Sequence, residues 1–337
     1  MRLPAFSSPR ILIGGFAALV AGSTLTSSST GVESGFGSFP ANCASALPSC
    51  SLCHAGSSPS ASGPQVRITT ASNRRALSFG NTLSVSTTIT GGIAGTTGGF
   101  VCETTAGTFT GNGTTTQVVS NPRGITHVNN TLRTWTYTYT APTTVGLVQL
   151  TSVGQSTNGS STGGDQFAFS GFDRAATSAT PVRLFVLPTS VTNFGSACPD
   201  GFGNYPVLGA NGTPSVGNTS FAFQMYGLQP GVIGLFWLGV NNPGFTGLNM
   251  NALGVTGCTS LAQNLVASVS LVTTGTASSV SQQQRAEGTA TVPLAIPNNP
   301  ALQGLVFDVQ GGQLDPTVQS FRSLPLTLTN GLRVVIP

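Results

Sequence analysis

The 337-residue sequence contains no lysine, only two histidines and few charged residues of either sign. A phosphate-binding loop uses a lysine, so its absence argues against that kind of nucleotide site. Charged residues make up 6% of the chain, against about 25% in ordinary globular proteins. With His54 and His127 as the only imidazoles, few acid–base or nucleophilic sets can be assembled. We therefore expect a protein that is not a conventional enzyme.

The charge balance is also weak. All twelve basic residues are arginine, and without Arg2 and Arg10 of the N-terminal segment ten remain against eight acidic residues, a net charge near +2. Such a small, scattered charge argues against nucleic acid as a partner. Paired carboxylates at a catalytic spacing are absent, and Asp308 and Asp315 are expected to be solvated loop charges.

No apolar run in the chain reaches the roughly 18 residues that a membrane helix needs. A shorter run, residues 11–22, follows Arg2 and Arg10 and precedes small residues around Ser23. This order is typical of a cleavable signal peptide over residues 1–23. We expect an exported protein, periplasmic, at the cell surface or extracellular, with no membrane span in its mature chain.

Short alternating segments, rather than helical periods, fill the rest of the sequence. Alternation of apolar and polar residues is clear at 82–90 and at 133–140, where Trp135, Tyr137 and Tyr139 share one face. Further strand-like segments follow at 145–153, 166–170, 182–187, 221–226, 232–240, 265–272, 290–296, 305–310 and 332–336. Glycine, asparagine and proline separate them, as in antiparallel sandwiches.

These patterns predict an all-β protein with two antiparallel β-sandwich domains, preceded by a signal peptide and a flexible, cysteine-containing arm. The expected divisions are the signal peptide at 1–23, a Ser/Gly/Pro-rich arm at 24–63, an Ig-like sandwich at 64–180 and a C-terminal β-sandwich module at 181–337.

The arm contains the run Cys50-Ser51-Leu52-Cys53-His54. This is the spacing at which two thiols bond the vinyl groups of a haem while the adjacent imidazole ligates the iron. It predicts one haem c, bound through Cys50 and Cys53 with His54 as an iron ligand. His127, the only other histidine, is the leading candidate for the second iron ligand, while Met225 and Met250 lie in the other domain.

Six cysteines leave the disulfides open. If Cys50 and Cys53 bind haem, the remaining four allow three pairings, and the one that respects the domains joins Cys43 to Cys102 and Cys198 to Cys258. The alternative is that all six form disulfides, with Cys50 bonded to Cys53 in a tight ring.

A second metal site is suggested by oxygen-bearing residues. Asn158 and Asp165 flank a polar stretch that could hold calcium, although one carboxylate is few for an ion that takes six to eight oxygens.

The order of several motifs resembles the choice-of-anchor V domain, a reeler-like β-sandwich of secreted bacterial proteins. The motifs are the CxxCH run at 50–54, Gly99-Phe100, Gly107-Thr108-Phe109, Thr126-His127, Trp135-Thr136-Tyr137, Ala141-Pro142 and the stretch from Asn158-Gly159 to Gly164-Asp165. The resemblance covers about residues 36–173 and implies a reeler-like fold and export rather than an activity. The second domain resembles C-terminal β modules of secreted bacterial proteins, which implies sorting or attachment.

Two functions remain open. The first is a secreted or cell-surface haem protein that passes single electrons to a redox partner protein, with the iron held by His54 and His127. The alternative is a non-catalytic structural or adhesive protein with disulfide-braced sandwiches, whose partner is a surface or matrix component.

Overall fold

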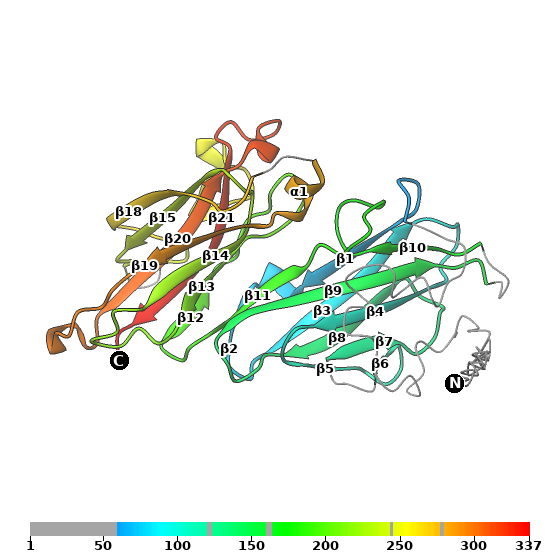
Figure 1. Ribbon diagram of the computed structural model, residues 1–337, viewed down its shortest axis with the longest axis horizontal. Helices are drawn as coiled ribbons and strands as arrows, with labels where there is room; N and C mark the ends of the chain where they lie inside the picture. The colour runs from blue at the N-terminus through cyan, green and yellow to red at the C-terminus, as the bar shows by residue number, and fades with distance from the viewer. Residues whose placement is uncertain (1–58, 120–122, 160–163, 243–244, 277–279) are drawn as a thin grey trace, which may run out of the picture.

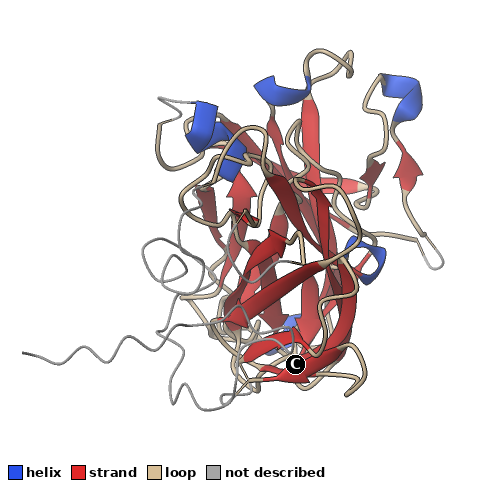
Figure 2. Ribbon diagram, turned by 90° about the vertical axis from the view of Figure 1, so that its right-hand side faces the viewer, coloured by secondary structure: helices blue, strands red, loops and turns tan. Residues whose placement is uncertain are grey.

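The computed structural model describes residues 59–119, 123–159, 164–242, 245–276 and 280–337. The expected signal peptide and nearly all of the expected arm lie outside these residues. Within them strands dominate, and the few helices are short pieces at the periphery (Figure 2). The prediction of an all-β protein is confirmed, and its strands form two sandwiches side by side along the longest axis (Figure 1).

In the described residues the first sandwich contains eleven strands and the 3-10 turn η1. They are β1 (Pro64–Thr70), η1 (Ala71–Asn73), β2 (Ala76–Ser78), β3 (Thr82–Gly91), β4 (Gly98–Thr104), β5 (Thr108–Thr110), β6 (Thr116–Val118), β7 (Gly124–His127), β8 (Thr134–Thr140), β9 (Gly146–Ser156), β10 (Gln166–Phe169) and β11 (Val182–Leu187). One sheet has the order β1-β3-β8-β5, and the other has the order β2-β11-β9-β4-β7-β6 with β10 beside β9. Strand β11 follows the boundary expected at 180/181, and it pairs with β9 and, in parallel, with β2.

The core of the first sandwich follows from the alternation of its strands. In β8 the side chains of Trp135, Tyr137 and Tyr139 are buried, whereas the threonines between them are exposed or half-buried. Successive side chains of a strand point to opposite faces of the sheet, so one face of β8 packs inward against the second sheet. The Tyr137 hydroxyl shares a 2.8 Å hydrogen bond with Thr87 Oγ1 of the neighbouring strand β3, which satisfies both buried hydroxyls.

The second sandwich, over its described part, contains ten strands, three 3-10 turns and one short helix. They are β12 (Val191–Phe194), β13 (Val207–Asn211), β14 (Ala222–Leu228), β15 (Ile233–Gly239), β16 (Leu248–Asn249), η2 (Asn251–Leu253), β17 (Thr259–Ser260), β18 (Leu265–Val272), α1 (Val280–Arg285), β19 (Gly288–Pro293), η3 (Pro300–Leu302), β20 (Val306–Leu314), η4 (Pro316–Val318) and β21 (Leu326–Val335). A five-stranded sheet of order β12-β21-β20-β15-β18 packs on a three-stranded sheet of order β13-β14-β19. No helix in the residues described is long and apolar enough to span a bilayer.

The two sandwiches share a hydrophobic core at their junction. Phe185 and Leu187 of β11 belong to the same buried cluster as Val207 and Leu208 of β13. The close approach depends on Gly209 of β13, since a Cβ there would lie 2.1 Å from the Phe185 ring. Only residues 188–190 connect β11 to β12. The junction is therefore a packed interface rather than a hinge.

Candidate functional site

Most of the predicted haem site lies outside the described residues. Cys43, Cys50, Cys53 and His54 all fall in the segment 1–58. His127, at the end of β7, is described, and its side chain is 8% exposed. Its Nδ1 lies 3.1 Å from the backbone nitrogen of Phe100 and 3.2 Å from the Phe100 carbonyl.

The surroundings of His127 fit an iron ligand only in part. Ligation through Nε2 needs Nδ1 to donate, as its contact with the Phe100 carbonyl would allow, whereas the Phe100 N–H donates to the same Nδ1 and so places the ring proton on Nε2. The aromatic rings beside it, however, are packed against one another: Phe100 lies 4.7 Å from Trp135 and 5.6 Å from Tyr137, centroid to centroid. All three side chains are buried in the core of the first sandwich. These rings therefore belong to the hydrophobic core of the first sandwich. Among the described residues, His127 is the one predicted haem ligand whose surroundings can be described.

Cys102 is a free thiol buried in the same core. Burial raises the pKa of the Cys102 thiol to about 12, an effect that a hydrogen bond with Tyr137 opposes. The group is therefore a protonated, unreactive thiol at neutral pH. The predicted bond to Cys43 stays a prediction, and it would require the arm to reach between the two sheets.

The predicted calcium residues lie where β9 and β10 approach each other. Asp165 Oδ2 accepts a 2.7 Å hydrogen bond from Gln155 Nε2, and Oδ1 accepts one of 3.1 Å from the backbone nitrogen of Asn158. The carboxylate thus holds the two strand ends together. Among the described residues no cluster of three or more His, Cys, Asp or Glu side chains could hold a metal ion. Calcium binding at Asn158 and Asp165 stays a prediction.

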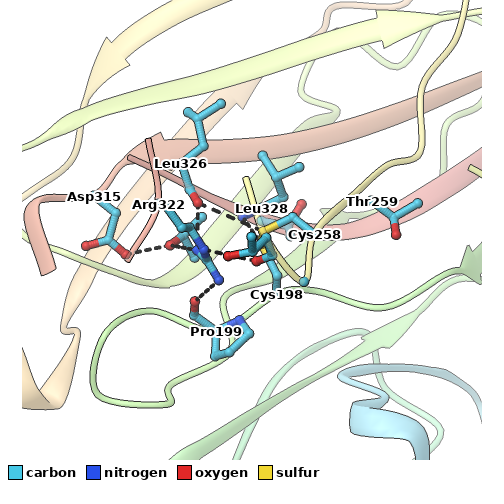
Figure 3. Close-up of a disulfide and its surroundings, with 12 residues drawn as sticks. Cys198, Pro199, Cys258, Thr259, Asp315, Arg322, Leu326 and Leu328 are labelled. Atoms are coloured by element: carbon cyan, nitrogen blue, oxygen red, sulfur yellow. Dashed lines mark hydrogen bonds between the residues drawn. A yellow bond between two sulfur atoms is a disulfide. The ribbon is translucent and has the colours of Figure 1, made fainter. Parts of the chain in front are cut away.

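The disulfide Cys198–Cys258 is present, with Cα atoms 5.1 Å apart (Figure 3). It lies on the face of the five-stranded sheet that points away from the three-stranded one, in a second apolar cluster with Val255 and Leu328. The Cys198 backbone nitrogen donates to the Leu328 carbonyl at 2.9 Å, and the Leu328 nitrogen donates to Cys198 Sγ at 3.2 Å. The bond therefore fastens residues 245–264 over the sheet.

Asp308 and Asp315 are buried, and the expectation of solvated loop charges was wrong. Asp308, on β20, is 2% exposed and forms a two-point ion pair with Arg333 of β21, with N–O distances of 3.0 and 3.2 Å. Asp315 is fully buried, and its Oδ1 accepts hydrogen bonds from the backbone and hydroxyl of Thr317. Both carboxylates therefore have structural partners.

A cavity of about 40 Å³ lies where the two sandwiches meet. From the first sandwich it is lined by Arg67 of β1, Arg75 just before β2 and Arg183 of β11. Asn204 and Tyr205 line it from the second. No sequence motif points to this cavity, because its arginines come from three separate segments of the chain. The available signal is a single arginine within an apolar strand, as in the sequence of β11, Val-Arg-Leu-Phe-Val-Leu.

The three arginines of the cavity are poorly neutralised. None forms an ion pair with a described residue. The side chain of Arg75 lies 5.1 Å over the Tyr205 ring, and its Nε is buried without a hydrogen-bond partner. Burial, opposed by Tyr205 and reinforced by the charges of Arg67 and Arg183, lowers the pKa of Arg75 to about 10. All three guanidinium groups are still charged at neutral pH.

The remaining contacts of these arginines are few and long. Arg67 donates to two backbone carbonyls, of Phe202 and Gly203, at 3.4 Å each. Arg183 donates through both terminal nitrogens to the carbonyl of Arg285, at 3.3 and 3.4 Å. Burial lowers the pKa of Arg183 to about 10 as well. The cavity is thus polar and positively charged, and several guanidinium N–H groups that line it have no short hydrogen bond to a described acceptor.

A second unusual surface is the free edge of the five-stranded sheet. Strand β18 is the last strand of that sheet in the described part of the chain, and it pairs only with β15. Most of its apolar residues are open to solvent, with Leu265 61%, Val266 67% and Val272 70% exposed, whereas Leu271 packs against the core. Soluble proteins usually protect such an edge with lysine, proline, a bulge or a covering segment. Strand β18 has no charged residue and no proline, although a register shift interrupts its pairing with β15 between Leu265 and Ala267.

Comparison of the sequence with protein-family models and with curated proteins finds no match. The choice-of-anchor V assignment therefore stays a prediction. Among solved structures the chain is similar to the Reelin-N domain of F-spondin, at 16% identity over 37% of this chain and 87% of that one, with a TM-score of 0.28. It is also similar to the human F-spondin reeler domain, at 16% identity over 36% of this chain and 89% of that one, with a TM-score of 0.26. Likeness at this level assigns no function.

Proposed function

We propose that the protein is an exported, non-catalytic structural or adhesive protein that associates with further copies of itself through the free edge of β18. The observation that carries this proposal is the uncovered apolar edge, since an edge of this kind is a template for pairing with another chain. The packed junction and the Cys198–Cys258 bond support it as well. Both restrict movement of the second sandwich, and so hold the five-stranded sheet that carries β18 in a fixed shape.

A second copy is the partner that the strand itself favours. The sequence Val266-Ala-Ser-Val269-Ser-Leu-Val272 reads nearly the same in both directions about Val269. If two copies pair antiparallel about that residue, Val266 lies opposite Val272 and Ser268 opposite Ser270. Directly opposed side chains are the unit of sheet stabilisation, and small or matched pairs fit without charge repulsion.

The N-terminal segment is a poorer candidate for covering this edge. The described chain begins at Pro59 in the first sandwich, whereas β18 lies at the far side of the second (Figure 1). The segment before Pro59 also lacks the alternating pattern that a pairing strand needs. A second copy, in contrast, brings an identical edge.

The size of the contact predicts its strength. Two paired strands of eight residues extend for about 27 Å at about 3.4 Å per residue. One strand pair gives an interface at the small end of the known range, where complexes are weak and reversible. Many copies on one surface would bind together far more tightly than any single pair. Weak pairing between copies suits an adhesive role better than a permanent dimer.

The test is sedimentation velocity of the full chain over a range of concentrations. We expect the average mass to rise toward that of a dimer for the wild type and to stay at the monomer for Val269→Lys, which places two like charges opposite each other. Leu253→Lys is the matched control, because Leu253 is 58% exposed but lies in η2, away from the edge. A monomeric wild type, or a Val269→Lys variant that associates as well as Leu253→Lys, would refute the proposal.

Haem binding is the second candidate function. It rests on the motif Cys50 to His54 in the sequence, with His127 as the candidate for the second iron ligand. The test is a visible absorption spectrum of the protein made in a host that attaches haem c. A reduced α band that survives acid-acetone extraction would support covalent haem, and its loss in His54→Ala would support ligation. A colourless wild type would remove this candidate.

A further inference from the structure

The cavity between the two sandwiches holds an uncompensated group of positive charges. Burying an ionised group without a partner is strongly unfavourable, and buried charges in proteins are as a rule paired. Arg75 is 5% exposed and Arg183 is 8% exposed, yet neither has an ion-pair partner among the described residues. A stable fold that keeps these residues together is best explained by a negative group that fills the space between them.

The acidic side chains that act on these arginines already have other partners. Asp200 is buried, and its Oδ1 accepts hydrogen bonds from the backbone nitrogens of Phe202 and Asn204 at 2.9 and 2.8 Å. Its Oδ2 accepts from two side-chain amides at 2.9 Å each. Glu287 pairs instead with Arg285, at an N–O distance of 2.7 Å. Neither carboxylate is therefore available to bridge the arginines of the cavity.

We propose that this cavity, lined by Arg67, Arg75 and Arg183, binds a small oxyanion, either a carboxylate group or an inorganic oxyanion of the phosphate and sulfate type. The planar guanidinium group presents parallel N–H donors that match two oxygens of such a group. Thr180 also lines the cavity, and its hydroxyl can add a donor to those of the arginines.

The size of the cavity agrees with that class of ligand. Its volume is about 40 Å³, and on the same measure one water needs about 10 to 15 Å³. The space therefore holds about three or four atoms of that size, as in a carboxylate, and a tetrahedral oxyanion is only slightly larger. A nucleotide or a sugar is too large for it.

The position of the cavity gives the bound ion a structural role. Its walls come from β1, β11 and the segment before β2 on one side, and from residues 203–205 on the other. An oxyanion there would bridge the two sandwiches and add to the apolar contact of Phe185 with β13. This site is independent of the pairing proposed for β18, which lies elsewhere on the second sandwich.

The test is thermal unfolding of the full chain in increasing sodium phosphate, sodium sulfate or sodium acetate, with ionic strength held constant by sodium chloride. A ligand that binds only the folded state raises the melting temperature in a saturable way. We expect the wild type to show this rise with at least one of the three oxyanions and not with chloride alone. Acetate and phosphate distinguish a carboxylate site from a tetrahedral one.

Two variants and one control decide the assignment. Arg75→Met, which keeps the volume and removes the charge, is expected to weaken the apparent oxyanion affinity at least tenfold and to be no less stable than the wild type without oxyanion. Arg67→Gln, on the half-buried wall of the cavity, provides the same comparison if Arg75→Met does not fold. Arg74→Met is the matched control, because Arg74 is adjacent in sequence but exposed. An equal response of the wild type and both cavity variants, or no oxyanion effect in the wild type, would overturn the proposal.

Discussion

Removal of the Cys198–Cys258 disulfide is expected to lower the free energy of unfolding by about 4 kcal/mol. The bonded residues are 60 positions apart. In the chain-entropy relation a loop of about 60 residues restricts the unfolded chain by about 14 cal/mol/K, which is about 4 kcal/mol at 25 °C. The variant is Cys198→Ala/Cys258→Ala, which removes both sulfurs and leaves no thiol to form a different bond.

The two tryptophans provide separate probes for this experiment. Trp135 is buried in the first sandwich, and Trp237 packs against the cluster that contains the disulfide. Urea unfolding followed by fluorescence should show a lower midpoint for the variant at an unchanged slope if only stability is altered. Hydrogen exchange should quicken first in residues 245–264, which the bond fastens over the sheet.

Two results would refute this reasoning. If the variant unfolds at the same urea concentration as the oxidised wild type, the bond does not restrict the unfolded chain as calculated. If Cys102→Ala, which removes one buried sulfur outside the disulfide, is destabilised as much as the double variant, the loss comes from packing rather than from the bond. For Cys102→Ala we expect a loss of about 1 kcal/mol.

Three further predictions follow from buried groups. Cys102 should resist alkylation in the native protein and react in urea without reductant; a requirement for reductant would indicate the bond to Cys43 instead. Asp200 has a pKa raised by burial from 3.8 to about 6, so the folded state binds a proton more tightly and stability should fall as the pH rises from about 4 to about 6, then level off. Asp200→Asn should remove this slope in urea unfolding at several pH values, and an unchanged slope would contradict the assignment. Gly209→Ala should lower stability by about 1 to 3 kcal/mol, because its Cβ would displace Phe185; an unchanged melting temperature would contradict the close packing of the junction.

The sequence predicted those strands whose alternation is strong. The segment expected at 133–140 is β8, with Trp135, Tyr137 and Tyr139 buried on the face assigned to them, and the segment expected at 265–272 is β18 with the same bounds. The pairing of Cys198 with Cys258 was also correct. The strand signal is local, because it depends only on the alternation of neighbouring residues. The disulfide could be predicted because four cysteines allow only three pairings.

Features that depend on tertiary contacts were missed. Strand β13 (Val207–Asn211) carries Gly209, which weakens the strand pattern and is explained only by the ring of Phe185 above it. Asp308 was assigned to solvent because its partner, Arg333, belongs to a strand distant in sequence. The arginines of the cavity are likewise brought together by packing, and no spacing between positions 67, 75 and 183 could reveal it.

The common core at the junction limits how this chain can be divided. Cutting after β11 would leave the apolar faces of Phe185 and Leu187 on one fragment and those of Val207 and Leu208 on the other. Each fragment would then expose an apolar surface prone to aggregation. Neither sandwich is therefore a module that can be moved into another protein by itself. Recombination that joins such proteins in new combinations would have to move the two sandwiches together.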